Sequence, residues 1–128
     1  MSVEDWISFA EEDLKMAKYS YDIGKFRYSC YFSQQAVEKF LKAFLVGNNR
    51  PFRRTHDLLE LLDLCKDIDK SFGELEKLNL EKLTAFSTIT RYPEFGIEVS
   101  QEDAEEALGI AEKVRDFVLK KLNLLKDK

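Results

Sequence analysis

The chain has 128 residues, of which 45% are hydrophobic and 34% are charged, and its formal net charge is −4. A chain of this length and composition predicts one folded domain, 1–128, and excludes an intrinsically disordered protein. The negative net charge excludes a general attraction to phosphate backbones, so any nucleic-acid site must be a local basic patch. Only five glycines and two prolines occur, which favours helices joined by few loops.

The first predicted helix begins after Ser2, where Asp5 completes a capping pattern, and ends near Gly24. The second runs from about Phe26 to Gly47 and is apolar on two faces. A helix with two apolar faces needs two packing partners, so we expect it at the centre of a bundle or between the bundle and another subunit. The first face holds Phe32, Ala36, Phe40, Ala43 and Phe44, and the second holds Tyr31, Val37, Leu41 and Leu45.

Pro51 breaks the helical pattern, and Thr55 is predicted to cap a third helix. A fourth element, predicted as two short pieces, covers about 72–89. A loop follows at 91–96, because Pro93 biases the preceding residue toward an extended conformation. Ser100 and Asp103 are predicted to cap the last helix. Together these elements predict an all-α, up-and-down bundle of four long helices plus a short fifth element.

Most catalytic templates are absent from the sequence, including Gly-rich phosphate loops and metal-ligand spacings, so we expect no metal and no cofactor. Cys30 and Cys65 lie in apolar runs and are predicted to be buried free thiols. The N-terminus lacks a signal-peptide pattern, and no apolar run is long enough to span a membrane. We therefore expect a cytoplasmic protein.

Three polar clusters remain as candidate sites. Gln34, Glu38 and Lys42 recur at four-residue steps on the central helix, which predicts a Glu38–Lys42 ion pair. That pair is either an ordinary surface salt bridge or part of a polar stripe in a cleft or dimer seam.

The second cluster, Arg50, Arg53, Arg54 and His56, precedes a helix N-terminus and could hold a phosphate. Its alternative is a solvated loop in which His56 takes a capping role. The third cluster, Arg91-Tyr92-Pro93, is a rigid turn anchored by its tyrosine. Its arginine could pair with the central-helix carboxylate or bind an anion.

Four stretches, taken in order, resemble the HEPN domain family. They are Ala10-Glu11-Glu12-Asp13-Leu14, the string YFSQQAVEKFLKA at 31–43, Thr55-His56-Asp57-Leu58, and Arg91-Tyr92-Pro93. The resemblance covers roughly residues 3–124, and it implies a dimeric bundle of four to five helices with a groove between the subunits. Stand-alone prokaryotic members are commonly encoded beside a minimal nucleotidyltransferase, as a toxin–antitoxin or two-component module.

The resemblance also implies either of two activities. Some members are metal-independent ribonucleases with an Arg-x(4–6)-His motif in the dimer groove, and others bind nucleotides or RNA without cutting. Arg91 matches the motif arginine, but Gly96, Ile97 and Glu98 stand where the histidine would be. The only formal match, Arg50 to His56, lies in the wrong element. Such a ribonuclease needs the imidazole at the scissile phosphate, so we expect binding rather than cleavage.

The resulting hypothesis is a homodimer that binds a nucleotide or RNA and partners a minimal nucleotidyltransferase. One alternative is an unusual ribonuclease in which His56 supplies the missing imidazole to Arg91. The other is a non-catalytic dimeric adaptor whose polar central-helix stripe is the dimer seam. The predicted ligand contacts are Arg91, Tyr92 (which offers a ring for base stacking), His56, Arg53, Arg54, Lys42 and Glu38.

Overall fold

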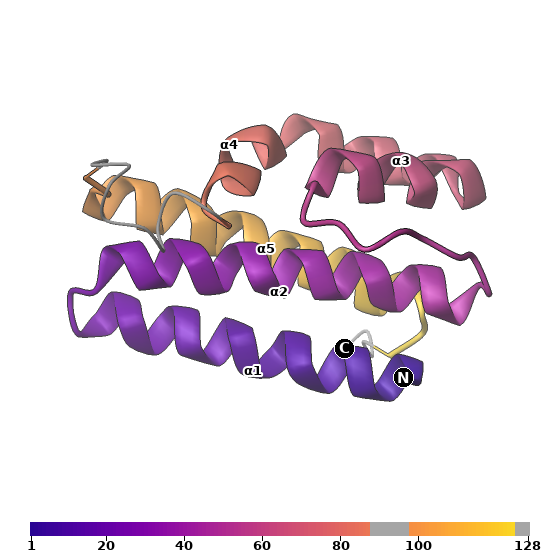
Figure 1. Ribbon diagram of the computed structural model, residues 1–128, viewed down its shortest axis with the longest axis horizontal. Helices are drawn as coiled ribbons and strands as arrows, with labels where there is room; N and C mark the ends of the chain where they lie inside the picture. The colour runs from indigo at the N-terminus through magenta and orange to yellow at the C-terminus, as the bar shows by residue number, and fades with distance from the viewer. Residues whose placement is uncertain (88–97, 125–128) are drawn as a thin grey trace.

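The computed structural model describes residues 1–87 and 98–124, and within them every regular element is a helix. Figure 1 shows α1 (Val3–Asp22), α2 (Phe26–Gly47) and α5 (Gln101–Lys121) as the three long rods of a bundle. The shorter α3 (Leu58–Ile68), the 3-10 helix η1 (Lys70–Lys77) and α4 (Leu80–Ala85) cover another side of α2. This confirms the predicted all-α helical bundle, and the fourth element does consist of two short pieces.

The long helices begin and end where their local sequence directs them. Ser2 and Asp5 form a reciprocal capping box at the start of α1, and Ser100 and Asp103 form another at the start of α5. Gly24 has a φ of +76°, a left-handed value that glycine adopts without strain, and it reverses the chain between α1 and α2. The predicted bounds of α2 agree with the observed ones.

One predicted cap is wrong. The cap of α3 is Asp57, whose Oδ1 accepts hydrogen bonds from the backbone N–H groups of Leu59 and Glu60. Thr55 lies two residues earlier, and its Oγ1 accepts a hydrogen bond from the N–H of Asp57 at 3.0 Å. Both residue types satisfy free amides, and the sequence alone did not distinguish which of the two would stand at the first turn.

Helix α2 is the centre of the fold and packs against α1, α3, α4 and α5. Both of its apolar faces are covered within one chain: Val37, Leu41 and Leu45 of the second face are fully buried. The second face therefore needs no other subunit to cover it. Phe44 of α2 contacts Phe72 of η1 at a centroid distance of 4.4 Å, and Phe72 contacts Phe117 of α5 at 4.9 Å.

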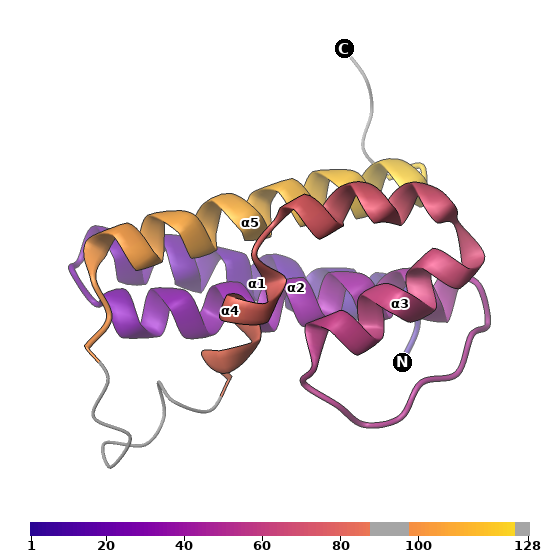
Figure 2. The same ribbon diagram turned by 90° about the horizontal axis from the view of Figure 1, so that it is seen from above.

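The connection between α2 and α3, which we call the return segment (48–57), runs back alongside α2 before α3 begins (Figures 1 and 2). Side-chain contacts give its register: Phe52 lies beside Lys42, and His56 lies beside Glu38. The return segment therefore covers the polar face of α2, together with Trp6 of α1 at Lys42. No described helix is long and apolar enough to cross a membrane.

Candidate functional site

A polar network lies where the return segment crosses the middle of α2. Its centre is the carboxylate of Glu38, a residue that is only 4% exposed. Oε1 of Glu38 lies 2.7 Å from Nδ1 of His56, and Oε2 accepts a hydrogen bond from Nζ of Lys42 at 2.9 Å. The predicted Glu38–Lys42 pair is thus present, and it is buried rather than a surface salt bridge.

Two glutamines extend this network along α2. Nε2 of Gln34 donates to Oε1 of Glu38 at 3.4 Å and lies 3.3 Å from the backbone oxygen of His56. Oε1 of Gln34 in turn accepts from Nε2 of Gln35 at 2.6 Å. A buried polar network is stable when its donors and acceptors are paired, and these contacts give both oxygens of the Glu38 carboxylate a partner.

The Lys42 ammonium is held between a carboxylate and two aromatic rings. Its Nζ lies 5.6 Å from the ring centroids of both Trp6 and Phe52, which themselves meet edge to face at 6.2 Å. A cation over aromatic faces is stabilised by the ring quadrupole, and here the rings also exclude water. Because Lys42 is only 6% exposed, its charge acts inside the network.

His56 is the member of the network that reaches the surface, with 55% of its side chain exposed. Its backbone is held on both sides, by the turn at Thr55 before it and by the Asp57 cap after it. The alternative of a capping role for His56 is not what the structure has, since the ring contacts Glu38.

The arginines near His56 differ in whether an acidic side chain already pairs with them. Arg53 makes a two-pronged ion pair with Glu60, with Nε–Oε2 and Nη2–Oε1 distances of 2.8 and 2.6 Å, and this pair raises the pKa of Arg53. Arg50 lies 3.7 Å from Asp67. Arg54 is exposed, and within residues 1–87 and 98–124 it has no ion-pair partner. Among the described residues, Arg54 is therefore the arginine of the predicted basic cluster that is left to bind an anion, and it stands two positions before His56 in the chain.

The structure thus brings three of the predicted site residues, Glu38, Lys42 and His56, into contact, and Arg54 is exposed two positions before His56 in the chain. Arg53 is nearby but engaged. Arg91 and Tyr92 lie outside the described residues, so their predicted roles stay predictions. Reasoning from the sequence alone missed the contribution of Phe52 and Trp6; the signal available was an aromatic residue directly after Pro51.

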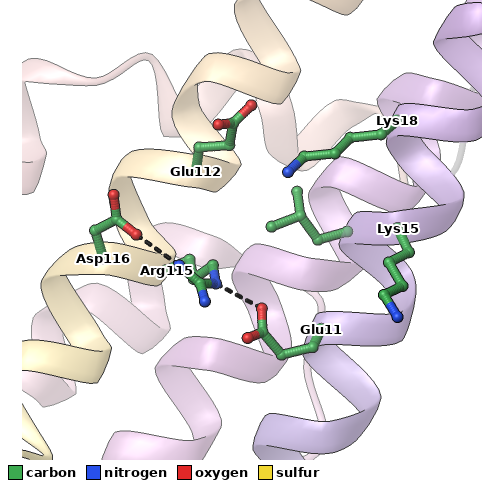
Figure 3. A pocket seen from close by; sticks show the side chains of 7 residues that line it. Glu11, Lys15, Lys18, Glu112, Arg115 and Asp116 are labelled. Atoms are coloured by element: carbon green, nitrogen blue, oxygen red, sulfur yellow. Dashed lines mark hydrogen bonds and ion pairs between the residues drawn. The ribbon is translucent and has the colours of Figure 1, made fainter. Parts of the chain in front are cut away.

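Apart from this network, a hollow of about 470 Å³ lies between α1 and α5 (Figure 3). Glu11, Lys15 and Lys18 face Glu112, Arg115 and Asp116 across it. Nε of Arg115 donates to Glu11 at 2.7 Å and Nη1 donates to Asp116 at 2.8 Å. Three acidic and three basic side chains line this hollow, and Arg115 is already paired. The charges around the hollow therefore favour neither an anion nor a cation.

The two cysteines are buried and free, as predicted, and burial raises the pKa of each thiol to about 12. Such thiols are inert at neutral pH. The described residues hold no group of three or more His, Cys, Asp or Glu side chains placed to bind a metal ion.

Comparison with known proteins decides the family. Residues 3–122 match the HEPN domain. The chain belongs to the HEPN domain family. It is 37% identical to a protein of Methanocaldococcus jannaschii named "Putative toxin MJ1304", in an alignment that covers 93% of this chain and 90% of that protein.

Two solved structures share the fold of this HEPN chain. TT1696 from Thermus thermophilus has a TM-score of 0.78 at 27% identity, over 93% of this chain and 97% of that one. ST0689, an archaeal HEPN homologue, has a TM-score of 0.77 at 27% identity, over 95% of this chain and 98% of that one. The family resemblance drawn from the motifs is therefore confirmed over nearly the whole chain.

Proposed function

We propose that this HEPN protein is toxin-like and binds a nucleotide or an RNA segment at the surface formed by His56 and Arg54. The observation that carries the proposal is the buried Glu38 carboxylate, which holds the imidazole of His56 at the surface. Arg54, two positions earlier in the chain, has no ion-pair partner among the described residues. Arginine presents a planar fork that matches the oxygens of a phosphate. The protein as a whole is acidic, so this local patch has to supply the attraction.

Binding is tested by fluorescence anisotropy with a labelled short single-stranded RNA over a range of salt concentrations. We expect affinity to fall with salt, and Arg54→Ala to weaken binding and reduce the slope of log affinity against log salt by roughly 0.7 to 1. Lys113→Ala is the matched control, because Lys113 is exposed on the outward face of α5. If wild type and Arg54→Ala bound the RNA equally well, Arg54 would not be part of the binding site.

The same samples test the ribonuclease alternative. If the protein only binds, the labelled RNA is recovered intact after long incubation without divalent metal. Cleavage products that disappear with His56→Ala would favour the alternative in which His56 supplies the imidazole.

The proposal includes a partner module, for which the support is the name of the relative from M. jannaschii and the HEPN family to which this chain belongs. The partner we expect is a minimal nucleotidyltransferase encoded beside this protein. Co-expression with that neighbour, followed by affinity purification, should recover a stable complex that suppresses any growth defect caused by this chain alone.

We also propose that the protein is a homodimer. Because much of the apolar surface of α2 is buried within the chain, we place the contact on the outer face of α1. Phe9, Met16 and Tyr19 on α1, with Ile23 just after it, are all exposed. Light scattering after size exclusion should give twice the monomer mass, and Phe9→Glu with Met16→Glu should give the monomer. Leu59→Glu, on the exposed face of α3, is the control.

A further inference from the structure

The position of the Glu38 carboxylate determines which nitrogen of His56 carries the proton. Oε1 of Glu38 lies 2.7 Å from Nδ1 of the ring, and its partner oxygen accepts a hydrogen bond from the Lys42 ammonium. An ionised carboxylate can only accept hydrogen bonds, so Nδ1 must be the donor. In the neutral imidazole the other nitrogen, Nε2, then has a lone pair and no proton.

The edge of the ring that carries Nε2 lies away from this buried carboxylate. Glu38 is 4% exposed, whereas more than half of the His56 side chain is accessible to solvent. The contact of Gln34 with the backbone oxygen of His56, at 3.3 Å, holds the residue in place from the side of α2. When the imidazole is neutral, the site therefore presents a fixed hydrogen-bond acceptor at Nε2.

A fixed acceptor selects a hydrogen-bond donor on the ligand. Phosphate oxygens are acceptors, and so they match the Arg54 guanidinium rather than Nε2 of a neutral imidazole. The donor nearest to a phosphate in a ribonucleotide is a ribose hydroxyl. The 2′-hydroxyl is also the group whose presence distinguishes RNA from DNA.

We infer that His56 recognises the ribose 2′-hydroxyl of a bound RNA segment. Nε2 accepts a hydrogen bond from this hydroxyl, while Arg54 contacts a neighbouring phosphate. The inference rests on the proposed function, and it adds a specificity for RNA over DNA. Glu38 is then a positioning residue, which acts through His56 and touches no ligand. Lys42, buried beside the other carboxylate oxygen, holds that carboxylate in place.

The tautomer is measured without any ligand. His56 is the one histidine of the sequence, so a long-range ¹H–¹⁵N spectrum of the imidazole contains a single set of signals. At a pH where the ring is neutral we expect Nδ1 to be protonated and Nε2 to be bare. A spectrum dominated by the Nε2-protonated form would overturn the inference.

The specificity is measured by comparing a short single-stranded RNA with the 2′-deoxy strand of the same base sequence. Wild type should prefer the RNA by about three- to tenfold, the contribution of one neutral hydrogen bond. In His56→Ala the ratio of the two affinities should fall to about one. In Arg54→Ala both affinities should fall together, with their ratio preserved. Circular dichroism checks that the variants are folded.

The outcomes separate this inference from the function on which it rests. If wild type binds both strands equally, or if His56→Ala keeps the preference for RNA, the reading of the 2′-hydroxyl is wrong and binding at this surface stands. If neither strand binds at low salt, the proposed function and this inference both fail.

Discussion

From the buried ion pair between Glu38 and Lys42 we predict that Glu38→Ala strongly lowers the free energy of unfolding. Glu38→Ala removes the acceptor of three contacts: those of Lys42 at 2.9 Å, His56 at 2.7 Å and Gln34 at 3.4 Å. It leaves the ammonium of Lys42, whose side chain is 8% exposed, in a buried site with no carboxylate. Removing one partner of a buried ion pair destabilises a protein far more than replacing both partners by apolar residues, because it leaves one buried charge without a partner.

The size of the effect follows from that burial. Breaking a buried pair by removing one partner costs about 3–5 kcal/mol. The rings of Trp6 and Phe52, each 5.6 Å from Lys42 Nζ, still stabilise the cation and favour the lower end of this range. Since the whole free energy of unfolding of a domain is about 5–15 kcal/mol, Glu38→Ala should remove a large part of it.

The assay is urea unfolding, followed by far-UV circular dichroism and by the fluorescence of Trp6, the one tryptophan of the sequence. Glu74→Ala is the control, because its pair with Lys77 is exposed and should contribute under about 0.5 kcal/mol. The double variant Glu38→Leu with Lys42→Leu removes both charges and should recover most of the loss. If Glu38→Ala lowered the free energy of unfolding by less than about 1 kcal/mol, the conclusion that this ion pair is buried away from water would be wrong.

Four further predictions follow from other buried or capping groups. Oγ of Ser33 is buried and has no hydrogen-bond partner among the described residues. Ser33→Ala should therefore raise the free energy of unfolding, by up to about 1 kcal/mol, in the same urea titration, and a clear loss would mean that the hydroxyl has a partner. Because burial raises the pKa of the Cys30 and Cys65 thiols to about 12, Ellman's reagent should label the folded protein far more slowly than the unfolded one at pH 8. The same shift predicts a loss of stability as pH rises from about 9 toward 12, since only the unfolded thiols ionise there. Hydrogen bonds at the start of η1, with a contribution from Lys121, lower the pKa of Asp69 from 3.8 to about 2. Its stabilising effect is complete above about pH 4 and is lost as pH falls toward 2, so Asp69→Asn should flatten the stability profile in that window; an unchanged profile would contradict the shift.

Much of the fold was predictable because the signals for it are local. The capping boxes at Ser2 and Ser100 act within four residues of chain, and the three- to four-residue spacing of apolar side chains marks the buried face of each helix. The error at Thr55 and Asp57 is of the same local kind, because either side chain can satisfy a first-turn amide.

The candidate site was predictable only as separate pieces. Glu38 and Lys42 are one helical turn apart, so their pairing could be inferred from the sequence. Their burial could not be inferred, because it depends on Trp6 and Phe52, which arrive from other elements. The same holds for the second apolar face of α2: the sequence indicated a partner for it, and the structure supplies that partner within the chain.

The order of residues along the chain was enough to predict an all-α bundle, the starts of its long helices and a resemblance to the HEPN family. It could not show that His56, 18 positions from Glu38, lies 2.7 Å from the Glu38 carboxylate, which is a result of the folded arrangement. That proximity depends on the direction of the return segment. Pro51 prevents a helix in the return segment but does not fix the direction in which the segment runs. That direction follows from the packing of α3 and Phe52 against α2.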